Sequence, residues 1–246
     1  TERCIGIAKC LKKDDGTMCP SYRATGEEKY STRGRARLLH EMMRGEIVKD
    51  GWRNRSVKES LELCFACKGC KSECPVAVDM ATYKAEFFSH YYRGRLRPLG
   101  AIAFGFLHAG CALAKRLPRV ANFFTQTPLP SRAIKFLLGI AAERQIPAFA
   151  DQTFKDWFKK RPAGNSSGSE VVLWPDTYND HFSPEVLQSA CEVLEKAGFR
   201  VVVPEESLTS GRPLYDSGML NTAVKILKKN IRVLKPWTDR GIPVVI

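Results

Sequence analysis

Residues 64–75 read Cys-Phe-Ala-Cys-Lys-Gly-Cys-Lys-Ser-Glu-Cys-Pro, and this stretch decides the fold of the segments around it. Its four cysteines have the spacing C-x2-C-x2-C-x3-C, and a proline follows directly. Thiols two residues apart let one tight loop wrap a compact inorganic core, because each sulfur then reaches a different metal atom. The small residues Ala66 and Gly69 leave room for backbone amides to turn toward that core. The run is typical of segments that bind iron–sulfur clusters.

A second, looser set of cysteines lies upstream. Cys19-Pro20 is the only other Cys-Pro pair, and Cys4 and Cys10 have the spacing of the first and third cysteines of the run. In two-cluster proteins the last cysteine of such a run binds the other cluster. Ile7 stands where the missing ligand is expected. We therefore predict a complete site of Cys19, Cys64, Cys67 and Cys70, and an incomplete site of Cys4, Cys10 and Cys74.

The two sites predict different cofactors. Four thiolates favour a 4Fe-4S cluster in the complete site. With Ile7 at the vacant position, the second site favours either a 3Fe-4S cluster or a 4Fe-4S cluster with one labile iron. A fourth ligand other than cysteine is a third alternative.

Other uses of cysteine fit the pattern less well. Nine cysteines are an odd number, and the chain shows no signal-peptide pattern, which argues against a secreted disulfide scaffold. Zinc favours paired thiolates or mixed Cys and His ligands, whereas the nearest histidines here are His40 and His90. Cys111 and Cys191 lie among apolar residues on helical patterns, and we expect both to be buried and inert.

The positive charge is confined to the first part of the chain. The net charge is +13, and residues 161–246 carry equal numbers of acidic and basic side chains. Basic residues near the cysteines either favour the reduced state of an anionic cluster or form a solvated helix face; they are Arg33, Arg35, Arg37, Lys68 and Lys71. Because the basic residues neither form one run nor alternate with aromatic residues, we expect no nucleic-acid partner.

Helical patterns dominate residues 1–160. The uncharged stretch 98–114 predicts a buried helix, and no run of about 18 apolar residues predicts one that spans a membrane. The expected helices cover residues 32–45, capped by Ser31 or Thr32; 56–63, begun by Ser56; 79–91, capped by Asp79; 100–117; 131–139; and 153–159.

Strands and helices alternate after residue 169. Residues 161–169 are rich in Pro, Gly and Ser and predict a flexible linker. The order strand–helix–strand–helix–strand predicts a parallel sheet with right-handed crossovers. Because three strands form a small sheet, we expect 170–246 to be a truncated α/β domain and the chain to belong to a longer protein. The expected strands are 170–174, 199–203 and 242–246, and the expected helices are 183–197 and 216–234.

Six strings carry a resemblance to a known family. The chain resembles the C-terminal iron–sulfur region of large bacterial FAD-linked oxidases related to D-lactate, glycolate and D-2-hydroxyglutarate dehydrogenases. The pattern Cys4–Ile7–Cys10 is also similar to the three-iron motif of succinate dehydrogenase and fumarate reductase iron–sulfur subunits. The strings are RCIGIAKC (3–10), MCPSYRAT (18–25), STRGRARLL (31–39), LCFACKGCKSECPVAVDMATYK (63–84), LWPDT (173–177) and GRPLYDSG (211–218).

The resemblance implies a fold for each part. Residues 1–160 would form an α-helical ferredoxin domain, and 170–246 would belong to a cysteine-rich domain named for a Cys-Cys-Gly motif. The motif's place here reads Leu208-Thr209-Ser210-Gly211, so we expect no thiol or third-cluster chemistry there. Residues 209–212 then form either an anion site at a helix start or an ordinary capped loop.

The resemblance also implies electron transfer. A flavin domain preceding this chain would bind FAD and oxidise a D-2-hydroxy acid, and the clusters would pass the electrons singly to a quinone or a carrier. We expect this fragment alone not to turn over substrate, and the pattern contains no evident catalytic residues. The expected location is cytoplasmic, with peripheral contact to the inner membrane surface left open. Two alternatives stay open as well: a structural metal-binding helical module without a redox role, and a basic nucleic-acid-binding domain.

Overall fold

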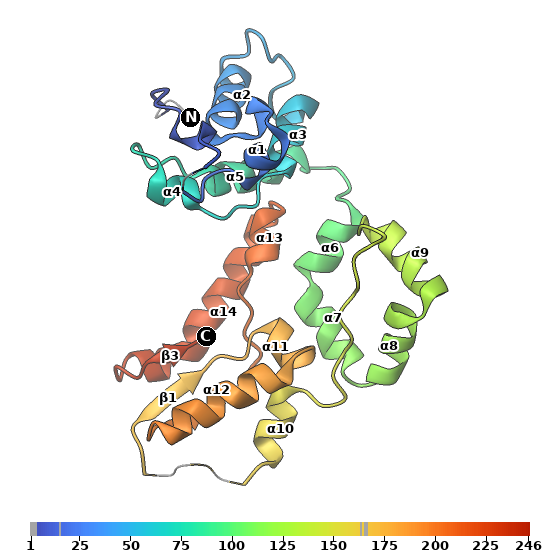
Figure 1. The fold of residues 1–246 in the computed structure, drawn as a ribbon, viewed down its shortest axis with the longest axis vertical. Helices are drawn as coiled ribbons and strands as arrows, with labels where there is room; N and C mark the ends of the chain where they lie inside the picture. The colour runs from blue at the N-terminus through green and yellow to red at the C-terminus, as the bar shows by residue number, and fades with distance from the viewer. Residues whose placement is uncertain (1–3, 15, 163, 165–166) are drawn as a thin grey trace. The chain divides into compact units, whose positions relative to one another are not determined.

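The computed structural model describes residues 4–14, 16–162, 164 and 167–246. The described part is mostly helical and contains one small parallel sheet (Figure 1). The chain divides into two compact units, one of Thr1–Leu96 with Tyr215–Leu220, the other of Arg97–Leu214 with Asn221–Ile246. Helices that follow Leu96 thus group with the sheet, while the predicted boundaries at 160 and 170 stay a prediction.

Short helices separated by tight loops form the first unit. It holds the seven cysteines for which metal binding is predicted. Its elements are η1 (Lys9–Leu11), α1 (Pro20–Thr25), η2 (Glu28–Tyr30), α2 (Thr32–Arg44), η3 (Gly51–Arg53), α3 (Arg55–Glu62), α4 (Gly69–Glu73) and α5 (Met80–Tyr91).

The caps of the longer helices follow the sequence closely. The Ser31 side chain accepts a hydrogen bond from the Gly34 amide at the start of α2, and Gly45 ends this helix with a φ of 72°. The Asp79 side chain caps α5 in the same way. For α3 the prediction that Ser56 begins the helix is wrong. Asn54 caps it instead, because the Asn54 side chain accepts a hydrogen bond from the Val57 amide and Ser56 already lies in the first turn.

The core of the first unit contains part of the cysteine set. Val57, Leu61 and Phe87 are fully buried there and pack with Met80 and Leu39. Four of the cysteines belong to this same buried group: Cys10, Cys19, Cys64 and Cys70. Their sulfurs are therefore enclosed by apolar side chains from α2, α3 and α5.

The second unit combines helices with the sheet (Figure 1). Helices α13 and α14 carry the residues Tyr215–Leu220 that group with the first unit. The elements from Leu99 onward are α6 (Leu99–Gly105), α7 (Leu107–Ala114), α8 (Pro118–Gln126), α9 (Pro128–Leu138), α10 (Phe154–Lys160), β1 (Glu170–Leu173), α11 (Thr177–His181), α12 (Pro184–Lys196), β2 (Arg200–Val202), α13 (Arg212–Asp216), α14 (Leu220–Thr238) and β3 (Val244–Val245).

The three predicted strands pair as a parallel sheet in the order β2-β1-β3. Val172 of β1 is in register with Val202 on one side and with Val244 on the other. The central strand is buried along Val171–Leu173, which explains its unbroken apolar sequence. Cys191 and Phe154 are fully buried against the sheet.

The helical region before the sheet differs from its prediction in two ways. The uncharged stretch 98–114 forms two helices, α6 and α7, separated at Phe106, and Leu99 and Phe104 are exposed rather than buried. The sequence analysis also missed α8, which begins at a proline and lacks a side-chain cap. The apolar residues of this region are therefore not a conventional helix core.

The predicted linker 161–169 lies partly outside the described residues, since 163, 165 and 166 are not described. Its first residue is held in place. The Arg161 guanidinium pairs with the Glu195 carboxylate through two contacts of 2.6 and 2.9 Å and lies over the ring of Phe158. Flexibility at this end is therefore restrained by an ion pair to α12.

Candidate metal centres

One pocket of the first unit gathers the four cysteines predicted for the complete site. Its lining includes Cys19, Cys64, Cys67 and Cys70. Cys19 precedes α1, Cys64 follows α3, and Cys70 lies on α4, so the pocket joins two segments that are far apart in the sequence. Sequence spacing alone linked the last three, whereas the arrival of Cys19 is a result of tertiary folding.

A second pocket gathers the other three cysteines. Cys4, Cys10 and Cys74 all contribute to its lining, and so does Ile7. Each pocket thus combines one N-terminal and one later cysteine segment, as the interleaved assignment predicts. Thr32 lines both pockets.

The backbone of the cysteine loops is unusual. In the described part of the chain, five residues other than glycine have positive φ: Ala8, Cys19, Ala66, Lys68 and Ala77. All five lie within or directly beside the cysteine segments. L-residues pay a steric cost in this region, and such strain collects at functional sites. The loops are coiled in a way that an ordinary helical core does not require.

The two cysteine loops repeat one conformation. Gly6 and Ala66 both have positive φ, at 80° and 50°, and two residues later Ala8 and Lys68 follow at 59° and 60°. The third ligand position of each loop, Cys10 or Cys70, is buried, whereas the middle position is exposed in both. The middle position is Ile7 in one loop and Cys67 in the other.

Backbone amides point at two of the sulfurs. The amide of Thr32, at the start of α2, donates to Cys19 Sγ at 2.9 Å, and the Thr32 hydroxyl contacts the same sulfur at 2.9 Å. The amide of Met80, at the start of α5, lies 3.4 Å from Cys70 Sγ. Hydrogen bonds to ligating sulfur stabilise negative charge and raise the reduction potential of a cluster.

Two buried cations lie beside the complete site. Arg35 is 2% exposed and lines the pocket; its Nε donates to the Ser60 carbonyl at 2.7 Å and its Nη2 to Ser21 Oγ at 2.8 Å. Lys84 Nζ donates to the Cys64 carbonyl at 2.6 Å. Burial lowers the pKa of both cations, and nearby Cys64 opposes this by favouring their charged forms. The sequence analysis did not single out Lys84.

The other basic residues near the cysteines are exposed. Arg33 pairs with Glu28 and Arg37 with Glu41, both on the outside of α2. Lys68 and Lys71 share Asp79. Of the five cations considered from the sequence, Arg35 is therefore the one whose charge is shielded from water.

A carboxylate ties the two cysteine segments together. The Glu73 side chain accepts a hydrogen bond from the Thr17 amide at 2.7 Å and another from the Thr17 hydroxyl. These bonds lower the pKa of Glu73. They connect the residue before Cys74 to the loop before Cys19, which holds the two Cys-Pro pairs in a fixed relation.

Burial separates two classes of cysteine. Desolvation raises the pKa of the thiols of Cys10, Cys19 and Cys70, so binding of iron must displace their protons. Cys111 and Cys191 lie in the second unit, away from the predicted sites, and burial raises the pKa of each to about 11. The expectation that these two are buried is confirmed.

The chemistry of the donor set fits iron–sulfur clusters. Thiols line the walls of two pockets, sulfur-directed amides are present, and a buried cation offsets negative charge. Within the described ranges, no three His, Cys, Asp or Glu side chains converge on a position for a single metal ion. A cluster has a different requirement, because each thiolate binds a separate iron.

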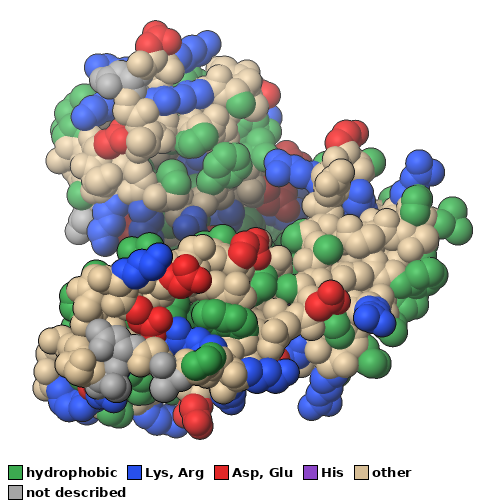
Figure 2. All heavy atoms as spheres, turned by 60° about the horizontal axis from the view of Figure 1, so that its bottom comes forward, with side chains coloured by type: hydrophobic (Ala, Val, Ile, Leu, Met, Phe, Trp, Pro, Cys, Tyr) green, Lys and Arg blue, Asp and Glu red, His purple; other side chains and the backbone are tan. Residues whose placement is uncertain are grey.

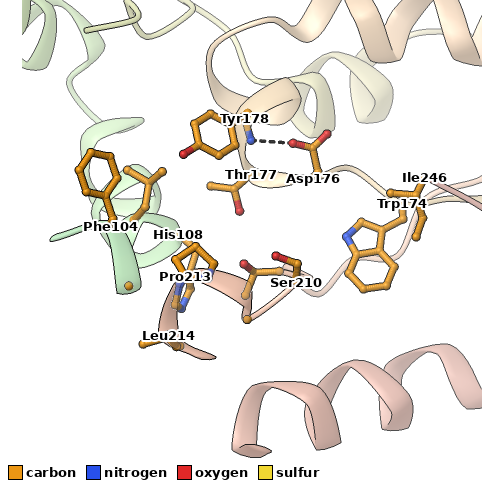
Figure 3. A pocket seen from close by; sticks show the side chains of 14 residues that line it. Phe104, His108, Trp174, Asp176, Thr177, Tyr178, Ser210, Pro213, Leu214 and Ile246 are labelled. Atoms are coloured by element: carbon orange, nitrogen blue, oxygen red, sulfur yellow. Dashed lines mark hydrogen bonds between the residues drawn. The ribbon is translucent and has the colours of Figure 1, made fainter. Parts of the chain in front are cut away.

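The second unit contains a pocket of about 160 Å3 at the carboxyl ends of the strands (Figure 3). Trp174 follows β1 and Ile246 follows β3, and both line the pocket. Phe104 and Tyr178 add further rings, and the side chains of Thr177 and Ser210 lie between them and Trp174. Ligands of open α/β sheets bind at this edge, where the strand order reverses.

The loop at residues 209–212 lies at this pocket. Thr209, Ser210 and Gly211 are part of its lining. The Arg212 amide donates to Ser210 Oγ at 3.4 Å, which is the local bonding of a capped loop. Of the two sequence interpretations, this contact favours the capped loop over the anion site.

Comparison with known proteins supports an iron–sulfur role for the cysteine-rich part. Residues 1–78 match the family model of a 4Fe-4S dicluster domain. Over 98% of its length the chain is 23% identical to D-2-hydroxyglutarate dehydrogenase of Escherichia coli (strain K12) and covers 28% of that protein. The protein of the same name from Pseudomonas putida is 25% identical with the same coverage.

Smaller proteins also match. The probable glycolate oxidase iron-sulfur subunit of Bacillus subtilis (strain 168) is 23% identical over 93% of this chain and 52% of its own length. One of the chains of fumarate reductase (CoM/CoB) from Methanothermobacter marburgensis is 24% identical over 73% of this chain and 40% of its own length. No solved structure shows a significant match.

The first part of the chain is therefore an iron–sulfur domain of the dicluster class. The whole chain is homologous to iron–sulfur subunits of oxidoreductases and, more particularly, to the C-terminal part of D-2-hydroxyglutarate dehydrogenases. The resemblance inferred from the six sequence strings is confirmed. The chain spans 28% of the length of these dehydrogenases.

Proposed function

We propose that this chain is the electron-transfer region of an FAD-linked oxidoreductase and that it carries two iron–sulfur clusters. Cys19, Cys64, Cys67 and Cys70 would hold a 4Fe-4S cluster. Cys4, Cys10 and Cys74 would hold the second cluster, a 3Fe-4S cluster or a 4Fe-4S cluster with a labile iron at Ile7. When bound, each cluster supplies a site that accepts and releases one electron at a time.

The observation that carries this proposal is the exchange of cysteines between the two loops. Each pocket is lined by a cysteine loop and by the Cys-Pro cysteine of the other segment. A structural metal site needs only one such set. Two neighbouring sets that share Thr32 instead suit transfer of an electron from one cluster to the other.

The residues of the chain determine how easily each cluster is reduced. The Thr32 and Met80 amides and the Arg35 guanidinium all favour extra negative charge at the complete site. The incomplete site has an apolar side chain at the corresponding exposed position. We infer different potentials for the two clusters, which gives electrons a direction.

The partners of this region lie outside the chain. By homology, FAD on a flavin domain would oxidise a D-2-hydroxy acid and supply the electrons. The acceptor would be a quinone or an electron carrier. The pocket of the second unit supports the quinone, because an apolar cavity of about 150 Å3 accepts one benzene-sized ring. Thr177 and Ser210 would donate hydrogen bonds to quinone oxygens there.

Anaerobic iron and sulfide analysis of the purified chain tests the cluster proposal. We expect seven to eight irons per chain, on the order of one 4Fe-4S and one 3Fe-4S or 4Fe-4S cluster, with broad visible absorption. Stoichiometric zinc in a colourless protein would instead support the structural metal module. Salt-sensitive retention on immobilised DNA without bound iron would support the nucleic-acid alternative.

Fluorescence of Trp174 tests the acceptor. A short-chain water-soluble quinone should quench it in a saturable way, and Trp174→Phe should remove the saturable component. Ser210→Ala should weaken binding by about tenfold, because one hydrogen bond contributes roughly 1 kcal/mol. Thr238→Ala, on the far part of α14, is the control. Quenching that is equal in all variants would exclude this pocket as the acceptor site.

A further inference from the structure

The apolar face of α8 points away from its own unit. Val120, Phe123 and Phe124 have the spacing i, i+3, i+4, so they form one stripe along the helix, and all three are exposed. No residue of α8 is buried. An ordinary surface helix buries such a stripe against the core.

Helix α9 repeats this arrangement. Leu129, Phe136 and Leu137 have the spacing i, i+7, i+8, and their exposed fractions are 79%, 86% and 59%. Ser131 is the one buried residue of this helix. The helices are joined by a single residue, Thr127, and pack against each other, so the two stripes belong to one surface.

The inner side of the α8–α9 pair is polar. The Asn122 side chain accepts a hydrogen bond from the Phe149 amide at 2.7 Å and donates one to the Phe149 carbonyl at 2.8 Å. The Thr125 hydroxyl bonds to the Ala121 carbonyl. The pair is therefore held to its unit by polar contacts, and its apolar residues are left for another environment.

The charge around these helices has one sign. From Phe87 to Ala142 the sequence contains no Asp or Glu, and it contains eight Lys and Arg residues. Arg116, Arg119 and Arg132 are exposed beside the apolar stripes. Figure 2 shows apolar side chains along the outer edge formed by α8 and α9, at the right, with Lys and Arg side chains beside them.

We propose that the α8–α9 surface is a membrane-binding surface that inserts its apolar stripes into the headgroup boundary of an anionic bilayer. Short helices with apolar residues on one side and basic residues beside them bind membranes in this way. The uniform positive charge matches anionic phospholipids, which attract each nearby Lys or Arg. No helix in the described part of the chain is long and apolar enough to cross the bilayer, so the contact is interfacial. The proposal does not depend on the clusters.

Vesicle co-sedimentation of the anaerobically purified chain tests this. The chain should sediment with vesicles of phosphatidylcholine containing about 30% phosphatidylglycerol and much less with phosphatidylcholine alone. Phe136→Gln and Phe124→Gln should each weaken partitioning by about tenfold, because each removes a buried aromatic side chain from the membrane. Arg119→Gln and Arg132→Gln should each weaken binding to anionic vesicles by about fivefold.

The controls use exposed residues of the same unit. Val193 on α12 is 66% exposed, and Val193→Gln should leave vesicle binding unchanged. Phe124→Trp should give a blue shift of fluorescence on addition of anionic vesicles. The proposal is overturned if the wild-type chain fails to bind anionic vesicles or if the phenylalanine variants bind as well as wild type. It is also overturned if the chain forms a dimer that Phe136→Gln dissociates, since the surface would then join two copies.

Discussion

Ile7 and Cys67 occupy equivalent positions in two loops of matching backbone conformation. Each is the exposed middle residue of its loop, and the residues on either side have positive φ in both loops. The two loops thus differ at this position in chemistry rather than in shape. A thiol at 67 and a branched aliphatic side chain at 7 explain how one chain can present a complete and an incomplete site.

Ile7→Cys should convert the incomplete site to a four-thiolate site. The loop already has the required conformation, so the new thiol needs no backbone change. We expect the oxidised 3Fe-4S signal in EPR spectra to disappear and iron to rise by about one per chain. Ile5→Cys is the matched control, because Ile5 is equally exposed but two residues out of position. An unchanged spectrum for Ile7→Cys, or the same change for Ile5→Cys, contradicts the assignment.

Cys67→Ser should remove the complete cluster. Cys67 is exposed, so the substitution costs little packing, and any loss of iron reports ligation. We expect about four fewer irons per chain and faster amide exchange over residues 4–75, since the polar loops depend on the metal. Cys191→Ala also removes one thiol, but it lies in the second unit. It should keep all the iron; equal loss in both variants would argue against specific ligation.

Arg35→Leu should destabilise the first unit and lower the potential of the complete cluster. The change leaves the Ser60 carbonyl and Ser21 hydroxyl without their donor, at a cost of about 3 kcal/mol. Loss of a buried positive charge disfavours the reduced state, so the midpoint should fall by roughly 50 mV, near the 59 mV of a tenfold change. Denaturant unfolding and an EPR-monitored redox titration measure the two effects.

Arg37→Leu is the control for Arg35. Arg37 lies on the same helix, but it is exposed and pairs with Glu41 on the surface. We expect a loss of about 0.5 kcal/mol and an unchanged midpoint. If the two variants shift the potential equally, the effect of Arg35 does not come from its burial beside the site.

Alkaline pH should weaken the second unit through its buried thiols. Burial raises the pKa of Cys191 to about 11, whereas an unfolded thiol has a pKa of about 8.5. Between these values the unfolded state loses the proton and the folded state keeps it, so stability falls as pH rises. The contribution is up to about 1.4 kcal/mol per pH unit.

Cys191→Ala isolates this effect. The free energy of unfolding, measured from pH 8 to 10.5, should fall less steeply in the variant than in the wild-type chain. The native thiol should also resist alkylation by iodoacetamide at pH 8. Rapid labelling of Cys191 in the native state, or parallel pH profiles of the two proteins, would contradict the buried neutral thiol.

Local features of the chain were determined by the sequence. The cysteine spacing within 64–75, the cap at Ser31, the stop at Gly45 and the three apolar strands all follow from interactions between residues close along the chain. Local rules describe them well because the partner groups are within a few residues. The Asn54 cap of α3 shows the limit, since two adequate capping residues lay close together.

Tertiary structure decided which distant residues meet and which faces are covered. Cys19 joins the pocket of Cys64, Cys67 and Cys70, and Arg35 is buried between α2 and the Ser60 carbonyl, because helices from separate segments pack there. The stripes of α8 and α9 have the periodicity of buried helix faces but point outward. Periodicity reveals that a helix has an apolar side, whereas only packing determines whether the protein itself covers that side.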